Sequence, residues 1–268
     1  MINNFNKDQL SILICSYDKA TDILKLYDDL LFKSSKKIKK GFNIFYGLNF
    51  HNPKKNIFYN KQILYSNRYE WSISLIDWLS NIKSDYILLL LDDQIIKKIS
   101  PKKIYKIVND MNSNDIKYAQ ISYGTHFIRR FLNESIIFKS KVLNSKYSIN
   151  LQPYIWEKKF LIDLLIKSET PWDFEIKSSQ IYNQENFKAY YYISKDIIFY
   201  EQFIERGKIY PQRFFEIFNY SCGVLKDRKE LNTKRKLISH LGYIFRTIKE
   251  FLNLLKSILK KNFIILND

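Results

Sequence analysis

The sequence has few of the residues that mark specialised protein classes. It contains only two cysteines, Cys15 and Cys222, which lie far apart in the chain. They provide neither a disulfide framework nor the ligand spacing of a zinc site, so a reducing compartment is favoured. The N-terminus has no apolar stretch typical of a signal peptide, and no run of about 18 apolar residues predicts a membrane span. We therefore expect a cytoplasmic protein without a membrane-spanning segment.

Glycine is also scarce, with six residues in 268. The first predicted loop, Ser16-Tyr17-Asp18-Lys19, lacks the glycines of a dinucleotide fingerprint or a P-loop, which argues against NAD and ATP. A polar loop with an aromatic ring and an acid can instead hold a nucleotide base by stacking and hydrogen bonding. Any surface loop contains such residues, so this signal is weak.

Basic and apolar residues are plentiful. The 44 Lys and Arg exceed the 27 Asp and Glu, giving a net charge of +17, and 46% of the residues are hydrophobic. The apolar content suffices for one sizeable core, and the charge favours an anionic partner such as a nucleoside diphosphate, an anionic lipid surface or nucleic acid. The bias toward Lys, Asn, Ile and Tyr also fits an AT-rich genome, so charge alone decides little.

Apolar runs and helical patterns alternate along the first half of the chain. Residues 10–16 form a short β-branched run typical of a buried parallel strand, and residues 22–32 have the spacing of a helix packed on a sheet. We predict further strands at 42–49, at 57–59 or 62–65, at 86–91 and at 190–200, and helices at 71–82, 101–111 and 157–167. Short strands and turns are expected between 116 and 150. This alternation indicates an α/β fold.

The strand predicted at 86–91 ends abruptly in Asp92-Asp93-Gln94. Ligands of open parallel sheets bind at the carboxyl ends of the strands, so these acids are expected to face a ligand. Hard carboxylate oxygens suit a divalent cation that bridges a diphosphate. The alternative is a solvated carboxylate after a strand, which is common.

A second acidic segment is Pro171-Trp172-Asp173-Phe174-Glu175. Aromatic faces stack on sugar rings, and a nearby carboxylate can deprotonate an acceptor hydroxyl. The structural alternative is a helix start, with Thr170 as the N-cap and Pro171 at the first helical position. Taken alone, the segment favours the helix start.

Other polar residues have weaker signals. Arg206-Gly207-Lys208 could close over a diphosphate with fixed positive charge, although a simple turn explains the segment equally well. His126 lies near two arginines and could contact phosphate, but none of the three histidines has the partners of a catalytic triad or a metal site.

The last part of the chain, residues 232–268, differs in character. Apolar residues recur at spacings of three and four from Leu237 to Ile258, with Lys and Arg between them, which predicts a long amphipathic helix. Its two interpretations are a helix lying on an anionic membrane surface and a helix docking on a partner protein. We expect a domain at 1–231 and a basic helical tail at 232–268.

Five segments follow one another along the chain: SILICSYDKATD, Trp71-Ser72, YILLLLDDQII, SINLQPYIWEKKFLIDLLIKSETPWDFE and FYEQFIERGKIY. Their order resembles that in the GT-A glycosyltransferases of bacterial capsule, O-antigen and lipopolysaccharide synthesis. The resemblance covers roughly residues 10–215, and its most specific part is the pairing of LQPYIW with ETPWDFE. It implies a GT-A, Rossmann-like mixed sheet flanked by helices, to which the apolar pattern described above adds a C-terminal amphipathic helix.

The resemblance also implies a set of site residues. Asp92 and Asp93 would hold Mn²⁺ or Mg²⁺, and Glu175, or Asp173, would be the catalytic base of an inverting transfer. The acceptor would contact Trp156 and Trp172. Contacts to the nucleotide sugar, with UDP favoured, would come from Ser16, Tyr17, Asp18, Arg68, Asp92, Arg206 and Lys208. Gln94 stands where a second outer carboxylate of the DxD motif is expected, which puts metal dependence in question.

The expected partners are a nucleotide-sugar donor and a glycan or lipid-linked acceptor. Residues 232–268 are expected to contact a membrane surface or a partner helix, and the chain could also form a homo-oligomer. The chain would act at the inner face of the cell membrane. A catalytically inactive GT-A-like assembly partner is the first alternative. A basic nucleic-acid-binding protein is the second, although no recognition motif is present and no nucleic acid is expected.

Overall fold

The computed structural model describes most of the chain between residues 8 and 209 and a few positions beyond it. The described residues are 6, 8–20, 22–24, 26–27, 41–50, 62–121, 137–142, 144–165, 170–194, 197–202, 204–205, 208–209, 229, 241, 244–245, 248, 252 and 264–266.

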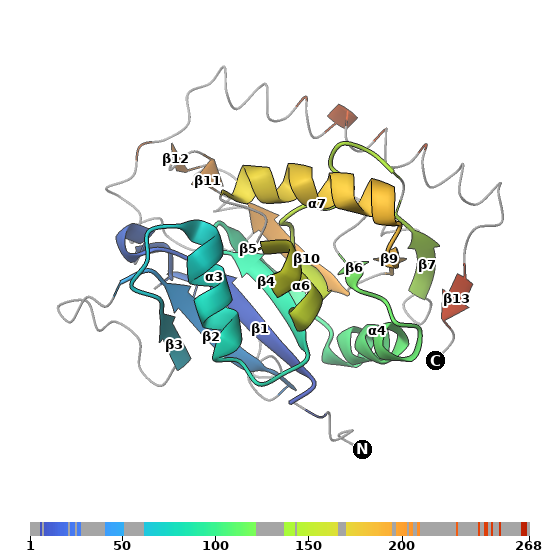
Figure 1. Ribbon diagram of the computed structural model, residues 1–268, viewed down its shortest axis with the longest axis horizontal. Helices are drawn as coiled ribbons and strands as arrows, with labels where there is room; N and C mark the ends of the chain where they lie inside the picture. The colour runs from blue at the N-terminus through green and yellow to red at the C-terminus, as the bar shows by residue number, and fades with distance from the viewer. Residues whose placement is uncertain are drawn as a thin grey trace.

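A nine-stranded mixed sheet forms the centre of the fold (Figure 1). Its order is β13-β7-β9-β6-β8-β4-β1-β2-β3. The strands are β1 (Leu10–Cys15), β2 (Asn43–Leu48), β3 (Gln62–Tyr65), β4 (Tyr86–Leu91), β6 (Tyr118–Gln120), β7 (Ile137–Lys141), β8 (Tyr154–Glu157), β9 (Ala189–Ile193) and β13 (Ile264–Leu266).

The sheet has a parallel half and a mixed half. Strands β4, β1, β2 and β3 are all parallel, with Ile12 opposite both Leu88 and Ile44. Strand β8 pairs antiparallel with β4 and with β6, and β7 pairs antiparallel with β9. The run of parallel strands places the ends of β1, β2 and β4 at one edge of the sheet.

Helices cover both faces of the sheet. The longer ones are α3 (Trp71–Ser80), α4 (Pro101–Ser113), α6 (Lys158–Leu165) and α7 (Pro171–Glu185). Ser100 caps α4 as predicted, because its hydroxyl accepts a hydrogen bond from the Lys103 amide and Pro101 occupies the first turn. The mixed α/β fold with a sheet flanked by helices is thus confirmed.

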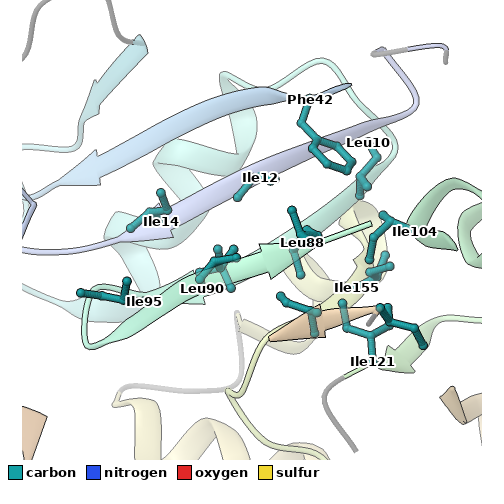
Figure 2. Close-up of a cluster of buried hydrophobic side chains, with 14 of the residues drawn as sticks. Leu10, Ile12, Ile14, Phe42, Leu88, Leu90, Ile95, Ile104, Ile121 and Ile155 are labelled. Atoms are coloured by element: carbon teal, nitrogen blue, oxygen red, sulfur yellow. The ribbon is translucent and has the colours of Figure 1, made fainter. Parts of the chain in front are cut away.

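Two apolar cores lie on opposite faces of the sheet because side chains alternate along each strand. Leu10, Ile12 and Ile14 of β1 point into the core that α4 covers, together with Leu88 and Leu90 of β4 (Figure 2). The intervening Leu13 and Cys15 face the second core, which contains residues of α3, α6 and α7. The continuous apolar runs of β1 and β4 therefore reflect burial on both faces.

Two short ribbons supplement the large sheet. Strand β5 (Gln94–Ile99) follows β4 after a two-residue turn and pairs antiparallel with β10 (Ile198–Gln202). Strand β11 (Ile204–Glu205) pairs with β12 (Lys208–Ile209). The strand predicted at 190–200 is therefore two strands, and β5 was not predicted.

The region predicted as a helical tail contains both helix and strand. Leu241, Ile244, Phe245, Ile248 and Leu252 are helical and exposed, consistent with the predicted amphipathic pattern. Strand β13, however, pairs antiparallel with β7, and the Lys106 ammonium group donates to the Leu266 carbonyl. At residues 264–266 the helix prediction is wrong, because these apolar residues complete the sheet edge.

The sequence led us to expect no membrane-spanning segment, and the helices of the structure bear on this expectation. In the part of the chain that the structure describes, no helix combines the length and apolar character that crossing a bilayer requires.

Candidate active site

The candidate site lies where the parallel strands β1 and β4 end side by side. Ser16 follows β1 directly, and Asp92 follows β4. The Asp92 amide donates to the Cys15 carbonyl at 3.1 Å, while the Ser16 amide donates to the Gly47 carbonyl at 3.0 Å. Backbone hydrogen bonds therefore continue past the ends of the strands and fix both residues at this edge.

Asp92 and Ser16, both predicted to contact the donor, meet in the structure. The Ser16 hydroxyl donates to Asp92 Oδ2 at 2.6 Å, a short hydrogen bond to a charged acceptor. The Asp92 carboxylate lies beside the buried Cys15 and contributes, after burial, to raising the pKa of that thiol. Cys15 is therefore an unreactive core residue.

The Asp93 carboxylate is only partly hydrogen-bonded. The Gln202 amide donates to its Oδ2 at 2.8 Å, whereas its Oδ1 is buried and has no hydrogen-bond partner. Burial raises the pKa of this carboxyl, and the Gln202 hydrogen bond only partly opposes the rise. An orphaned carboxylate oxygen is costly, so it marks a position where a cation or a donor group would be stabilising.

Gln94 does not occupy the ligand position that the DxD comparison suggested. Its side chain is buried, with Oε1 accepting from the Leu91 amide and Nε2 donating to the Leu151 carbonyl, both at 3.0 Å. The hydroxyl of buried Tyr27 also donates to its backbone carbonyl. Gln94 therefore faces the interior and packs beneath the Asp92-Asp93 turn.

The other predicted donor contacts follow β1 or β3, lie on β12, or fall outside the described residues. Tyr17 is exposed after β1, and Asp18 begins the 3₁₀ helix η1 (Asp18–Ala20). Arg68 is exposed after β3, in a loop that Asn49 holds by donating to the Arg68 carbonyl. Lys208 is exposed on β12, and Arg206 lies outside the described residues.

The PWDFE segment forms the first turn of α7. Thr170 is its N-cap and accepts from the Asp173 amide, while the Thr170 hydroxyl donates to Asp173 Oδ2 at 2.7 Å. Pro171 lies at the start of the helix, so the helix-start interpretation is confirmed. Asp173 is thereby engaged in capping.

Glu175 is part-buried one turn into the same helix. Its Oε1 accepts from the Leu151 amide at 2.8 Å. Burial raises the pKa of the Glu175 carboxyl, and the Leu151 hydrogen bond opposes the rise. A carboxylate whose pKa is raised above its ordinary value is a stronger base, which suits Glu175 for proton abstraction.

The two tryptophans predicted to contact an acceptor differ sharply in exposure. Trp172 is 75% exposed at the start of α7, so an incoming ligand can reach it. Trp156 is 0% exposed and packs between the rings of Tyr118 and Phe174. A fully buried indole cannot contact an acceptor; Trp156 is a core residue because β8 lies in the middle of the sheet.

Gln202 is a site residue that the sequence analysis missed. It lies at the end of β10, where its pairing with Gln94 brings it beside Asp93. The two residues are 109 positions apart in the sequence. Only the pairing of β5 with β10 could have signalled this contact, and β5 was not predicted.

The acids present could provide part of a cation site. Among the described residues, no group of three or more His, Cys, Asp and Glu side chains is arranged to hold a metal. Two carboxylates, one with an unsatisfied oxygen, fit a cation that takes its remaining ligands from a diphosphate and water.

No family model and no curated protein matches this chain. Solved structures with a similar arrangement include residues 1–349 of S. aureus TarS, with 13% identity and a TM-score of 0.46. The match covers 78% of this chain and 63% of that TarS chain. The same protein in complex with UDP-GlcNAc matches with 15% identity and a TM-score of 0.46, over 78% of this chain and 64% of that chain.

Another match is a cytidylyltransferase from Leptospira borgpetersenii, with 14% identity and a TM-score of 0.43, over 70% of this chain and 77% of that chain. A UDP-glucose pyrophosphorylase complexed with UDP-glucose has 7% identity and a TM-score of 0.41, over 72% of this chain and 93% of that chain. At these identities and TM-scores, the activities of the matched proteins do not transfer to this chain.

Proposed function

We propose that this chain is a glycosyltransferase that moves a sugar from a nucleotide-sugar donor, with UDP favoured, to a hydroxyl of a glycan or lipid-linked acceptor. The observation that carries the proposal is the Asp92-Asp93 pair at the carboxyl edge of four parallel strands, with one carboxylate oxygen buried and unsatisfied. Such an edge is where α/β sheets bind ligands. From the sequence resemblance we further propose a role in bacterial surface polysaccharide synthesis.

The donor would lie over the ends of β1 and β4. In this proposal Tyr17 stacks on the base, Ser16 and Asp18 line the nucleoside, and Asp92 and Asp93 hold Mn²⁺ or Mg²⁺. The cation would neutralise charge that grows on the leaving nucleoside diphosphate. Positive charge for the diphosphate would also come from Arg68, Arg206 and Lys208.

The acceptor would approach from the start of α7. Exposed Trp172 offers an aromatic face to a sugar ring, and the Glu175 carboxylate takes the proton of the attacking hydroxyl. The oxygen then forms a bond to the anomeric carbon as the bond to the diphosphate breaks, which inverts the configuration. Asp173 is the second choice for the base; its carboxylate is held in the helix cap by Thr170, as that of Glu175 is held by the Leu151 amide.

We also propose that the chain attaches to the inner face of the cell membrane through residues 232–268. The described helical positions Leu241, Ile244, Phe245, Ile248 and Leu252 expose apolar side chains on successive turns, and the surrounding sequence is rich in Lys and Arg. Apolar insertion combined with basic flanks suits an anionic bilayer.

Vesicle co-sedimentation with Phe245→Ser/Ile248→Ser, compared with Tyr147→Ser, tests the attachment. Tyr147 is an exposed aromatic residue elsewhere in the chain and serves as the matched control. Loss of binding to anionic vesicles only in the double variant would support attachment. Unchanged binding would favour a partner helix.

A thermal-shift screen of UDP, GDP, CMP and TDP and their sugar conjugates, with and without Mn²⁺, tests the donor proposal. One nucleotide family should stabilise the chain, more strongly with Mn²⁺, and Asp93→Asn should lose the metal-dependent part. Stabilisation without turnover of any sugar would favour an inactive assembly partner. If no nucleotide stabilises the chain, a gel shift that persists at moderate salt would favour nucleic-acid binding.

A further inference from the structure

Gln94 connects the Asp92-Asp93 turn to Leu151, whose amide is the hydrogen-bond donor to Glu175. Its Oε1 accepts from the Leu91 amide at 3.0 Å, at the end of β4. Its Nε2 donates to the Leu151 carbonyl at 3.0 Å. The Leu151 amide in turn donates to Glu175 Oε1 at 2.8 Å. A continuous line of three hydrogen bonds therefore joins the end of β4 to α7.

The segment between these two ends is fixed firmly. Ser179, one turn beyond Glu175, accepts from the Ile149 amide at 3.0 Å and donates to the Ile149 carbonyl at 3.1 Å. Ile149, Leu151 and Ser179 are all buried. Because water is excluded, each hydrogen bond is costly to break without a replacement partner.

The chemistry of this position requires an amide. Gln94 must accept from a backbone N–H and donate to a backbone carbonyl at the same time. A carboxylate can only accept, and an apolar side chain can neither accept nor donate. The pairing of β5 with β10 and the hydrogen bond from Tyr27 hold its backbone in place.

We propose that Gln94 is a positioning residue that sets the Asp92-Asp93 turn and Glu175 in one fixed relation. This role rests on the proposed function, in which the turn binds the donor and Glu175 serves the acceptor. Gln94 touches neither substrate. It acts by preventing the turn and the Ile149–Leu151 segment from moving independently, which precise orientation of two reactants requires.

The test compares Gln94→Leu and Gln94→Glu with Tyr105→Phe. Tyr105 is the control because it is also buried and its hydroxyl donates to a backbone carbonyl, that of Gly41, which lies before the start of β2 and therefore at the opposite edge of the sheet from the turn. Gln94→Glu retains the acceptor for Leu91 and removes only the donor to Leu151. It therefore remains informative if Gln94→Leu does not fold.

The two readouts are the Kd for UDP with Mn²⁺ and the hydrogen-exchange rate of the Leu151 amide. Both Gln94 variants should weaken UDP binding about tenfold, as expected when groups that orient ligand residues are lost. The Leu151 amide, which bonds to Glu175 and not to Gln94, should exchange faster in both. Tyr105→Phe should change neither readout, whatever its loss in Tm.

The outcomes separate this role from the proposed function. If the wild-type chain binds UDP but the Gln94 variants match Tyr105→Phe in Kd and in Leu151 exchange, the positioning role alone is overturned. A wild-type chain that binds no nucleoside diphosphate would overturn both the proposed function and this role.

Discussion

Asp93→Asn should make the chain more stable while removing its response to metal. The wild-type carboxylate has one buried oxygen without a partner, and burial raises its pKa. Asparagine keeps a carbonyl oxygen that can accept from Gln202 and replaces the charged orphan with a neutral amide. An unsatisfied buried polar group costs about 1–3 kcal/mol, and more when charged, so the gain should be about 1 kcal/mol.

The measurement is thermal unfolding at pH 7 without metal or nucleotide. For a chain of this size, about 1 kcal/mol corresponds to a rise in Tm of roughly 2–4 °C. Asp163→Asn is the matched control, because Asp163 is exposed on α6 and its substitution should leave Tm nearly unchanged. With Mn²⁺ and UDP, the wild-type Tm should rise more than that of Asp93→Asn.

The pH dependence of the Tm difference checks whether the buried charge of Asp93 causes the gain in stability. Because the folded-state pKa of Asp93 is raised, its penalty is absent at low pH, where the carboxyl is protonated in both states, and appears as pH rises through the folded pKa. The Tm advantage of Asp93→Asn should therefore vanish below pH 3.8, the ordinary pKa of an aspartate. A variant less stable than wild type at pH 7 would refute the reasoning.

Four further substitutions have defined outcomes. A Cβ at Gly47 would lie 2.4 Å from the buried Trp78 ring, so Gly47→Ala should lower the free energy of unfolding, measured by urea titration, by about 3 kcal/mol. Gly41→Ala should lower the free energy of unfolding by less, because the nearest contact of its Cβ would be at 3.1 Å. Glu175→Gln should gain stability over wild type as pH rises from 4.5 to 7, because burial raises the Glu175 pKa; an advantage that shrinks over this range would contradict this. Trp172→Ala should change stability by less than about 0.5 kcal/mol yet raise the acceptor KM in transfer assays, and an unchanged KM would exclude the stacking role.

The parts of the fold that could be predicted are those with local signals. The apolar runs of β1 and β4 are continuous because both faces of these strands are buried, and the helix at 101–113 begins with a serine cap and a proline. The adjacent acids at 92 and 93 follow an apolar run, so their place at a sheet edge was also readable. These features depend on residues close together in the sequence.

The features that could not be predicted depend on distant partners. Strand β5 contains two consecutive lysines, Lys97 and Lys98, and its pairing with β10 decides its structure. Trp156 is buried because β4 and β6 flank its strand, which its own segment does not reveal. Strand β13 joins β7 across more than 120 residues of sequence, and the apolar pattern of the tail gave no sign that helix would change to strand.

The structure also changes the meaning of glutamine at position 94. Read as a defective DxD motif, Gln94 favours an inactive protein, because a metal-binding carboxylate is replaced. Its side chain is instead buried as the first residue of β5, where both ends of the amide bond to backbone groups. A carboxylate there would leave the Leu151 carbonyl without its donor and place a second buried charge beside Asp93. The glutamine is thus the residue that this interior position requires, and it is no evidence against a cation held by Asp92 and Asp93.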